Sequence, residues 1–366
     1  MIAYIKPLEP FFFRDAKPFD KGEGWANGIF PPLPSTVYGA FRTAAISQKT
    51  TLAEYYDKDS MITDEMGSPD DFGSFRIQSV LLNDSAGIMI PTPLDLVENS
   101  NSLKPLEKNN DTIISDIPGL DFYKSGNVSF KSPEISWVDR YAIENYLLGA
   151  SDIDIEDTIS PIIEERKTGI EKDPTSKKAK DHMLYVQQMI RLKDSFGFAV
   201  ETQNISALEP RGVIKLGHDG RVFSYEIDDN SNFAFLDNKK DTIIESIEKT
   251  KRFKIIFTSP AILKNGWLPD NVSDSDFTWR YQGTVIKITS IITGRPMRVG
   301  GWDIKNKGPK PMYKALPPGS VYYCELIEGK SDSVYNLFFN QNISDVENNE
   351  NYEKQGFGHT LIGILQ

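Results

Sequence analysis

The chain of 366 residues contains one cysteine, Cys324, and only three histidines. A single thiol cannot form an intrachain disulfide, and no HExxH motif or paired-histidine spacing provides a zinc site. No apolar run approaches the roughly 18 residues of a membrane span, and prolines and charges interrupt the start of the chain, where a signal peptide needs its apolar core. We therefore expect a cytoplasmic protein with no metal ion and no membrane contact.

The motifs of several large enzyme classes are also missing. There is no P-loop, no GxGxxG fingerprint and no GxSxG nucleophile elbow. The glycine pair at 300–301 lacks the following helix that a phosphate cradle needs. The acidic run at 152–157 lacks the spacing of a calcium-binding EF-hand loop, so a solvated acidic loop explains it better. These absences predict a protein without a bound cofactor.

The composition is that of a folded, acidic protein. Apolar residues make up 39% and charged residues 25%, and 41 Lys and Arg against 52 Asp and Glu leave a net charge of −11. The length favours two domains. The acidic balance argues against a general nucleic-acid coat, but it leaves room for a local basic groove.

The pattern of elements in the first half predicts an α+β fold. A strand, a helix, two strands, a second helix and a last strand follow one another, which is the ferredoxin-like order. The expected elements are strand 2–8, helix 37–47, strand 75–82, strand 197–201, helix 206–216 and strand 222–227. Two strands at 183–193 and 196–202 are also positioned to pair.

The second half shows a similar order without a clear first helix. Its expected elements are strand 251–263, strand 320–327, helix 331–341 and strand 361–365. The polar segment 228–250 is the candidate linker, which gives domains at 1–235 and 236–366. We predict tandem ferredoxin-like (RRM-like) domains with long loop and β-hairpin insertions.

Two polar segments interrupt this pattern in the first half. Residues 97–130 are rich in Asn and Ser and predict a surface excursion. Residues 150–182 are densely charged, which favours a mobile, solvated loop.

One segment is strongly basic in this acidic chain. Residues 294–316 carry six Lys or Arg against Asp303 alone. Trp302, Met312 and Tyr313 are interleaved, a composition that suits base stacking beside phosphate contacts. A flexible charged loop is the alternative that composition leaves open.

A glycine loop precedes the last strand of each half, at 217–221 and at 356–360. Because glycine has no Cβ, such loops can bring backbone N–H groups close to a phosphodiester. Ordinary turns between elements are the alternative. The recurrence of the loop in both halves, together with the basic segment, favours RNA as the ligand.

These blocks resemble a known family. FFFRDAKPF at 11–19 and FPPLPSTVYGAFRTA at 30–44 are similar to the N-terminal signature of RAMP proteins, most closely subunit three of the Cmr complex, the type III-B CRISPR effector. ERKTGIEKD, LYVQQMIRL and KLGHDGR resemble its middle blocks, and GRPMRVGGWD, GPKPMYKALPPGSVYY and GFGHTLIGI resemble its C-terminal blocks. The GHDGR loop departs from the family's glycine-glycine-glutamate form at His218 and Asp219.

The resemblance implies a non-catalytic subunit for defence against foreign RNA and DNA. Such a subunit binds the 5′ repeat-derived handle of the crRNA and packs on the large polymerase/cyclase-like subunit and on a neighbouring backbone RAMP subunit, while target RNA is held indirectly by the complex. Lys167, Gly169 and Ile170 would lie on a projecting hairpin that wedges against RNA. The other implied RNA-binding residues are Arg14, Lys17, Ser35, Thr36, Tyr38, Arg42, Arg295, Arg298, Lys310, Lys314, Gly356, Phe357, Gly358 and His359.

Two alternatives remain at this stage. On the same fold, a metal-independent CRISPR-repeat endoribonuclease would need a base and an acid near the 2′-OH, usually histidines. His182, His218 and His359 are scattered, and no histidine occurs before them. A purely protein-binding scaffold is the other alternative, with the basic segment facing an acidic partner.

Overall fold

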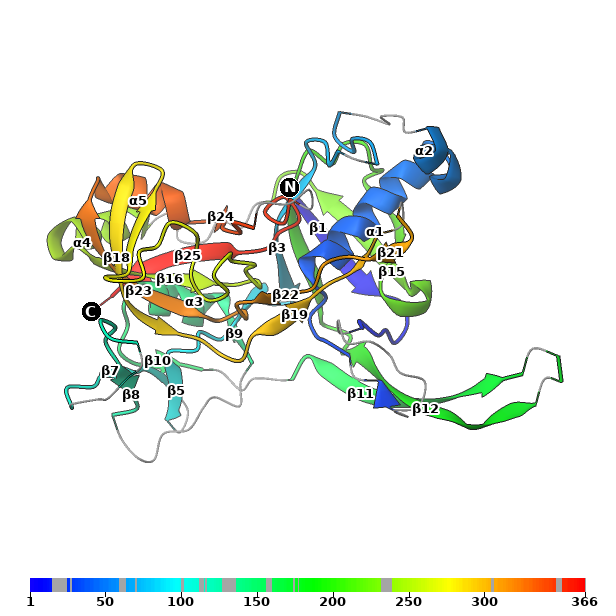
Figure 1. Ribbon diagram of the computed structural model, residues 1–366, viewed down its shortest axis with the longest axis horizontal. Coiled ribbons are helices and arrows are strands. Elements are labelled where there is room, and N and C mark those ends of the chain that lie inside the picture. Colours follow the sequence, from blue (N-terminus) through cyan, green and yellow to red (C-terminus); the bar gives the residue numbers. More distant parts are fainter. Residues whose placement is uncertain are drawn as a thin grey trace.

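The computed structural model places two β-sheets side by side, with a long hairpin projecting from one end (Figure 1). The chain termini lie on different sheets. The structure describes residues 1–14, 25–26, 28–58, 64–69, 71–99, 102–111, 115, 117–126, 136–155, 160–173, 175–176, 178–231, 239–303, 306–346 and 351–365.

The first sheet has seven antiparallel strands in the order β14-β15-β1-β13-β3-β4-β9. Strand β1 pairs with β15 on one side and with β13 on the other, so that Tyr4 lies between Glu226 and Ala199. The strands are β1 (Ile2–Pro7), β3 (Arg76–Asn83), β4 (Ile88–Pro91), β9 (Trp137–Asp139), β13 (Gly197–Gln203), β14 (Arg211–Lys215) and β15 (Val222–Asp228).

One face of this sheet is covered by α1 (Pro34–Ser47), which follows the proline-rich segment. Pro34 occupies the first turn, where a missing N–H costs no hydrogen bond. Val37, Phe41 and Ala45 recur at a spacing of four residues and are buried against the sheet. The short helix α2 (Leu52–Lys58) follows α1 directly.

The second sheet has six strands in the order β17-β18-β23-β16-β25-β24. All of its neighbours are antiparallel. The strands are β16 (Arg252–Phe257), β17 (Thr278–Tyr281), β18 (Thr284–Ile292), β23 (Val321–Glu328), β24 (Gln341–Asn342) and β25 (His359–Ile364).

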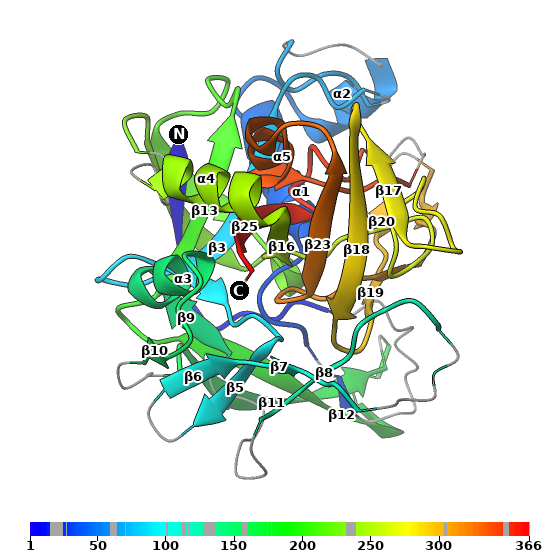
Figure 2. The same ribbon diagram turned by 90° about the vertical axis from the view of Figure 1, so that its left-hand side faces the viewer.

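Helices cover both faces of the second sheet (Figure 2). Phe253 stacks on Phe338 of α5 (Ser331–Phe338), beside α4 (Lys240–Thr250). The next residue, Lys254, lies over Tyr146 of α3 (Arg140–Leu147). Because successive side chains of a strand point to opposite faces, α5 and α3 lie on opposite sides of β16. A helix from the first half of the chain therefore completes the core around the second sheet.

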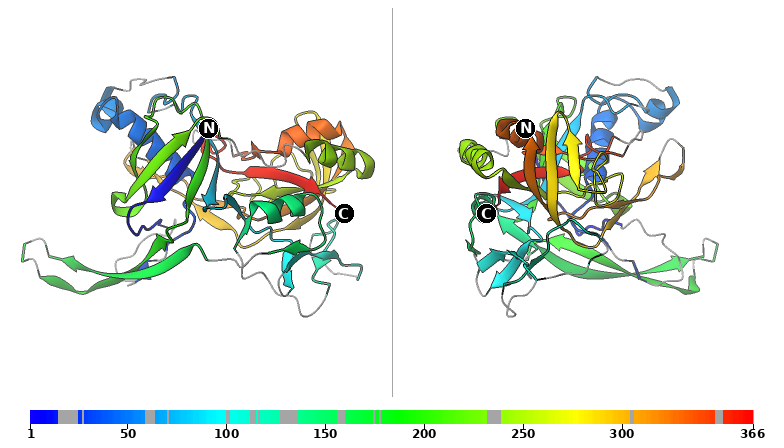
Figure 3. Two further views of the ribbon diagram at one scale, coloured as in Figure 1. Left: turned by 180° about the vertical axis from the view of Figure 1, so that it is seen from behind. Right: turned by 60° about the vertical axis from the view of Figure 1, so that its left-hand side comes forward.

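The hairpin of β11 (Ile162–Lys172) and β12 (Ala179–Leu192) extends away from both sheets, as Figure 3 shows from behind. Its base pairs with β2 (Trp25–Ala26) and bridges Phe11. Short strands form the remaining small sheets: β5 (Leu96–Asn99) with β6 (Ser102–Pro105) and β10 (Ile153–Asp154), and β7 (Glu107–Lys108) with β8 (Tyr123–Lys124).

Most of the predicted elements are present. Residues 264–284 contain no helix, as expected. The helix predicted at 206–216 is wrong, because residues 211–215 form the edge strand β14. Two β-branched residues next to Gly212 pair readily with β15, and this pairing overrides the local helical pattern. The predicted pairing of 183–193 with 196–202 is also wrong, since β12 pairs with β11 and β13 pairs with β1 and β3.

Three segments are more ordered than their polarity predicts. The charged segment 150–182 contains β10, β11 and the start of β12, so the prediction of a mobile loop is wrong there. The candidate linker contains α4, whose Ile243 and Ile247 are fully buried. The excursion at 97–130 contains β6, β7 and β8. The predicted boundary at 235 lies outside the described residues and stays a prediction. No helix among the described residues is long and apolar enough to span a membrane.

Candidate nucleic-acid interface

The N-terminal half of α1 presents one partly exposed face. Ser35, Gly39 and Thr43 follow one another at a spacing of four residues on the side away from the buried Val37 and Phe41. The first turn of a helix carries a partial positive charge. In α1 the N–H groups of Thr36 and Val37 donate to the carbonyl of Leu33, while no described residue accepts from the N–H of Ser35. This face is therefore suited to a negatively charged group.

Gly39 leaves the middle of this face bare. A Cβ added to Gly39 would have no atom of the described residues within 4 Å, and its backbone is in an ordinary helical conformation. Neither packing nor backbone geometry within the chain therefore requires glycine here, although glycine destabilises a helix interior by about 1 kcal/mol relative to alanine. A ligand that approaches the helix backbone would explain it.

Arg42 fixes the wall beside this face. Its guanidinium donates to the carbonyls of Met66, Ser68 and Asp71 at 3.0, 2.5 and 2.7 Å, and to the hydroxyl of Tyr55 at 2.9 Å. It also lies 5.4 Å from the ring centroid of Phe72. Arg42 thus holds the 66–72 loop against α1 and brings a positive charge to the same place.

Tyr38 is a structural residue of the same wall. Its side chain is buried, stacks on Phe75 with ring centroids 4.8 Å apart, and donates to the carbonyl of Phe72 at 3.2 Å. Burial raises the pKa of this phenol above its usual range. The predicted role of Tyr38 as an RNA contact is therefore corrected to support of the 72–75 segment, because its hydroxyl is directed at backbone rather than at the surface.

The basic segment forms a ribbon that faces α1. β19 (Met297–Val299) pairs with β22 (Tyr313–Ala315), and β20 (Trp302–Asp303) pairs with β21 (Gly308–Pro309). Val299 and Ala315 are buried on the underside, in a cluster with Leu33 at the start of α1. In Figure 1 the ribbon crosses from the second sheet toward α1. The flexible-loop alternative does not describe these paired strands.

The upper side of the ribbon is cationic. Arg298 and Lys314 are directly opposite each other in the β19–β22 pair, and both are exposed. Neither forms an ion pair with a residue that the structure describes. Arg295, just before β19, is also exposed, and Trp302 at the far end is 61% exposed. Exposed cations beside an exposed indole are the combination that binds single-stranded nucleic acid.

A groove of about 550 Å³ separates the ribbon from α1 and α2, and we call it the α1 groove. Tyr56 of α2 faces the groove, and burial raises the pKa of its phenol. Arg42 of α1 opposes this shift and Asp303 of the ribbon adds to it, as expected if the two walls of the groove lie close together. The predicted residues Ser35, Thr36, Tyr38, Arg42 and Lys310 all line this groove. Its other lining residues include Gly39, Tyr55, Tyr56, Phe72, Gly300, Gly301, Trp302, Asp303, Asn306, Tyr352 and Gln355.

The C-terminal glycine turn at 356–359 does not offer its backbone to a ligand. The N–H groups of Gly356, Phe357 and Gly358 donate to the carbonyls of Glu353, Tyr352 and Pro260 at 3.1, 3.1 and 2.7 Å. The N–H of His359 donates to Ser259 Oγ at 2.8 Å. All four donors are used inside the protein, so the predicted contact with a phosphodiester is wrong.

The side chains of this turn are equally enclosed. Phe357 is 0% exposed and His359 is 1% exposed. His359 Nδ1 lies 2.5 Å from Thr258 Oγ1 and its Nε2 lies 2.7 Å from Asn340 Oδ1, while burial lowers its pKa to about 3. Phe357 and His359 therefore pack the junction between the sheets, and their predicted RNA contacts are corrected.

The other glycine loop, at 217–221, lies against the N-terminal segment. The N–H of His218 donates to the carbonyl of Phe12 at 2.9 Å, and Arg221 forms an ion pair with Glu9. The His218 side chain is about half exposed and lies 3.1 Å from Asp219. The two glycine loops thus have different surroundings, and neither lines the α1 groove.

The remaining predicted residues lie elsewhere. Lys167 and Ile170 are exposed on β11 of the projecting hairpin, as the family resemblance implies. Gly169 is opposite Tyr185, whose ring would lie 2.3 Å from an added Cβ, so glycine makes room for that ring. Arg14 is exposed and bridges Gly28, and Lys17 lies outside the described residues.

Sequence reasoning missed Gly39, Tyr56 and Gln355. The glycine pair 300–301 was considered only for a helix-linked phosphate cradle, yet it lines the groove through the ribbon. The signal in the sequence was the glycine at position 39 within a predicted helix. Glycine destabilises a helix interior, so its presence there suggests a packing or binding role.

Neither a metal centre nor a histidine pair can be identified in the described part of the chain. No three His, Cys, Asp or Glu side chains come together there as metal ligands. His359 is held neutral and His218 lies apart from the groove. The geometry suits binding by phosphate contacts and stacking.

The comparisons with known proteins agree with a mixed α/β architecture of mostly antiparallel sheets. A chain of the type III-B Cmr-beta complex bound to cognate target RNA has a TM-score of 0.53 at 17% identity, with 98% of this chain and 96% of that chain covered. A chain of the same complex with target RNA and AMPPnP has a TM-score of 0.52 at 17% identity, with 98% and 95% covered. No curated protein sequence matches this chain.

The fold is thus that of a protein subunit found in type III-B CRISPR effector complexes. The family described as CRISPR-associated protein (Cas_Cmr3) matches residues 3–365. This chain belongs to that family, which confirms the resemblance to subunit three of the Cmr complex.

Proposed function

We propose that this chain binds the 5′ repeat-derived handle of the crRNA in a type III-B effector complex, and that the α1 groove holds part of the handle. The handle would enter as single-stranded RNA, with phosphates at the α1 N-terminus and along the ribbon. A splayed base would stack on Trp302.

One observation supports this more than any other: bare helix backbone at Gly39 faces a cationic ribbon across an open groove. A phosphate needs close N–H donors and positive charge, and a base needs an exposed aromatic ring. The α1 groove combines these features in a chain whose net charge is −11. The surrounding acidity would limit nonspecific RNA binding.

The proposed assembly follows from the family and from the strand order. We interpret β15-β1-β13-β3 and β25-β16-β23-β18 as two ferredoxin-like sheets. In the first sheet β14 replaces the second helix, and in the second sheet α4 covers the place of the missing first helix. As in the family resemblance, this subunit would pack on the large polymerase/cyclase-like subunit and on a neighbouring backbone RAMP subunit in the cytoplasm. Target RNA would be held indirectly.

The binding test uses a double variant on the upper side of the ribbon, Arg298→Ala with Lys314→Ala. Handle-bearing RNA should bind the variant at least tenfold more weakly than wild type at low salt. The slope of log K against log salt should fall by about 0.7 for each lost phosphate contact. Fluorescence anisotropy across a salt series measures both quantities.

The matched control is Lys249→Ala with Lys330→Ala, which removes two exposed cations at the helices of the second sheet. It should keep the affinity for handle RNA within about twofold. Equal losses in both double variants would mean that net charge, rather than the α1 groove, sets RNA affinity.

We also propose that the chain is not a nuclease. Precursor repeat RNA incubated with the pure protein without metal should remain intact. Cleavage that disappears on changing His182, His218 or His359 to alanine would establish the endoribonuclease alternative instead.

A further inference from the structure

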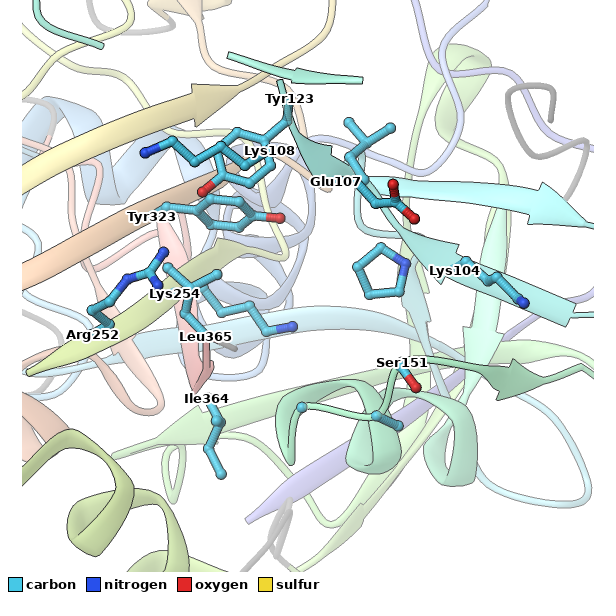
Figure 4. Close-up of a pocket in the computed structure, with 14 residues that line it drawn as sticks. Lys104, Glu107, Lys108, Tyr123, Ser151, Arg252, Lys254, Tyr323, Ile364 and Leu365 are labelled. Carbon is cyan, nitrogen blue, oxygen red and sulfur yellow. The ribbon is translucent and has the colours of Figure 1, made fainter. Parts of the chain in front are cut away.

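A second cavity, of about 450 Å³, lies on the far side of the molecule from the α1 groove, between the second sheet and the strands β6, β7 and β8 (Figure 4). Arg252 and Lys254 of β16 both line it. Residues two apart on a strand point to the same side, so these two cations enter the cavity together. Nothing in the proposed RNA site uses either residue.

Lys254 is an unusual residue for a core strand. Its side chain is only 3% exposed, and it forms no hydrogen bond or ion pair with the described residues. Its Nζ lies 3.2 Å from the ring centroid of Tyr146. Burial lowers the pKa of Lys254 to about 8, whereas the nearby Asp95 raises it. A buried cation without a direct anionic partner is costly, and an anion in the cavity would offset that cost.

The one acid close behind Lys254 is already engaged. Asp95 is fully buried and accepts hydrogen bonds from Tyr146 Oη and Tyr323 Oη, both at 2.7 Å. These tyrosines hold the Asp95 carboxylate on the protein side of Lys254. The ammonium is therefore directed into the cavity, as Figure 4 shows, and Asp95 acts on it from behind without a direct ion pair.

The cavity entrance adds further cations. Arg252 has no acidic partner within ion-pair distance among the described residues. Lys104 and Lys108 line the opposite wall, paired with Asp152 at 3.1 Å and Asp121 at 2.6 Å. Arg252 and Lys254 are thus the cations left for a ligand, and Glu107 is the one carboxylate among the described residues of the lining.

We propose that this cavity binds a small phosphorylated ligand, with its phosphate group between Arg252 and Lys254. A guanidinium and an ammonium together match the charge of a phosphate dianion. The volume falls in the range of small-molecule sites, and the rings of Tyr123 and Tyr323 provide an apolar wall beside the charges. This proposal does not depend on crRNA binding.

The test titrates the full chain with inorganic phosphate and, separately, with AMP, in calorimetry in a phosphate-free buffer. Wild type should bind at least one of them saturably, with a dissociation constant below about 10 mM. Lys254→Met and Arg252→Met should each weaken binding by about tenfold to hundredfold, the loss expected for one charge-assisted hydrogen bond. Glu107→Gln should tighten binding by a few fold.

Two features make the outcome decisive. Lys249→Met on α4 removes a lysine outside the cavity and should bind like wild type. Arg252 is only partly buried, so Arg252→Met tests the site even if Lys254→Met fails to fold. Much tighter binding of AMP than of phosphate identifies a nucleotide ligand, whereas equal affinities identify recognition of the phosphate group alone.

The proposal is overturned if wild type binds neither probe, or if Arg252→Met binds both as well as wild type does. In that case Lys254 only braces β16 against α3. Handle-RNA affinity is measured alongside and should not change in Arg252→Met, so failure here is distinct from failure of the α1 groove.

Discussion

The α1 groove and the C-terminal turn at 356–359 both contain glycines, but the two regions differ in how much free space surrounds the glycine Cα. A Cβ on Gly39 in the groove would have no atom of the described residues within 4 Å. A Cβ on Gly358 in the turn would lie 1.8 Å from the carbonyl oxygen of Ile343, and Gly358 has a φ of +69°. The same residue type thus leaves a surface open in one region and allows close packing in the other.

The comparison shows which kind of glycine can serve a ligand. Backbone N–H groups are available only where the fold has not already used them. In the turn, every backbone N–H from Gly356 to His359 already donates a hydrogen bond to a backbone carbonyl or to the Ser259 hydroxyl. In the first turn of α1, Pro34 has no N–H and those of Thr36 and Val37 donate to the carbonyl of Leu33, so the N–H of Ser35 is the donor that the described residues leave open.

The largest effect is expected from Gly358→Ala. Alanine would need both a positive φ and space that Ile343 occupies, so the free energy of unfolding should fall by more than about 3 kcal/mol. Urea denaturation followed by circular dichroism measures this loss. A loss below about 1 kcal/mol would show that the turn is looser than its packing indicates.

The next largest effect is the loss of folding stability at acidic pH. Because the pKa of His359 is lowered to about 3 in the folded protein, between that value and about 6.5 the unfolded chain binds a proton that the folded chain does not. Stability should therefore fall as pH drops below about 6.5, by about 1.4 kcal/mol per pH unit from this residue. Urea denaturation at pH 7 and pH 5 measures the difference.

The variant His359→Gln should show a smaller loss between these two pH values, although it is less stable at pH 7. His218→Gln changes an exposed histidine and serves as the control, which should keep the wild-type acid sensitivity. Identical pH profiles for wild type and His359→Gln would rule out the buried histidine as the source.

A smaller effect is expected in the open region, from Trp302→Ala. Loss of one stacking platform should weaken binding of handle RNA by about 1–3 kcal/mol. Because the indole is mostly exposed, the free energy of unfolding should change by less than about 0.5 kcal/mol. Anisotropy and denaturation of the same sample separate the two, and unchanged RNA affinity would place the handle elsewhere.

The smallest effect is expected from Gly39→Ala, which should raise stability where Gly358→Ala lowers it. Gly39→Ala fills empty space on a helix and should stabilise the protein by about 0.5–1 kcal/mol. Gly39→Leu should also fold, yet it should reduce RNA affinity because its side chain would project into the groove. Full RNA affinity in Gly39→Leu would contradict close approach of RNA to this helix.

Much of the local structure was predictable from patterns within a few residues of each other. The spacing of apolar residues predicted the helix at 37–47, and the alternation of apolar residues at 2–8 predicted β1. Strands were also predicted at the positions of β23 and β25. The blocks that resemble the family also brought five groove residues into the prediction. Edge pairing was not predictable in this way, because β14 depends on a partner strand formed by residues 222–228.

The sequence by itself determined the family, the helices α1 and α5, several strands of both large sheets, and the concentration of cations at 294–316, since each depends on residues that are neighbours in the chain. Only the tertiary structure decided which glycines are open and which cations face a cavity. These properties depend on partners far away in the chain, such as Ile343 beside Gly358, Tyr146 beside Lys254 and the ribbon beside Gly39. Burial and charge at a site are set by all the segments that meet there, and no local pattern records that meeting.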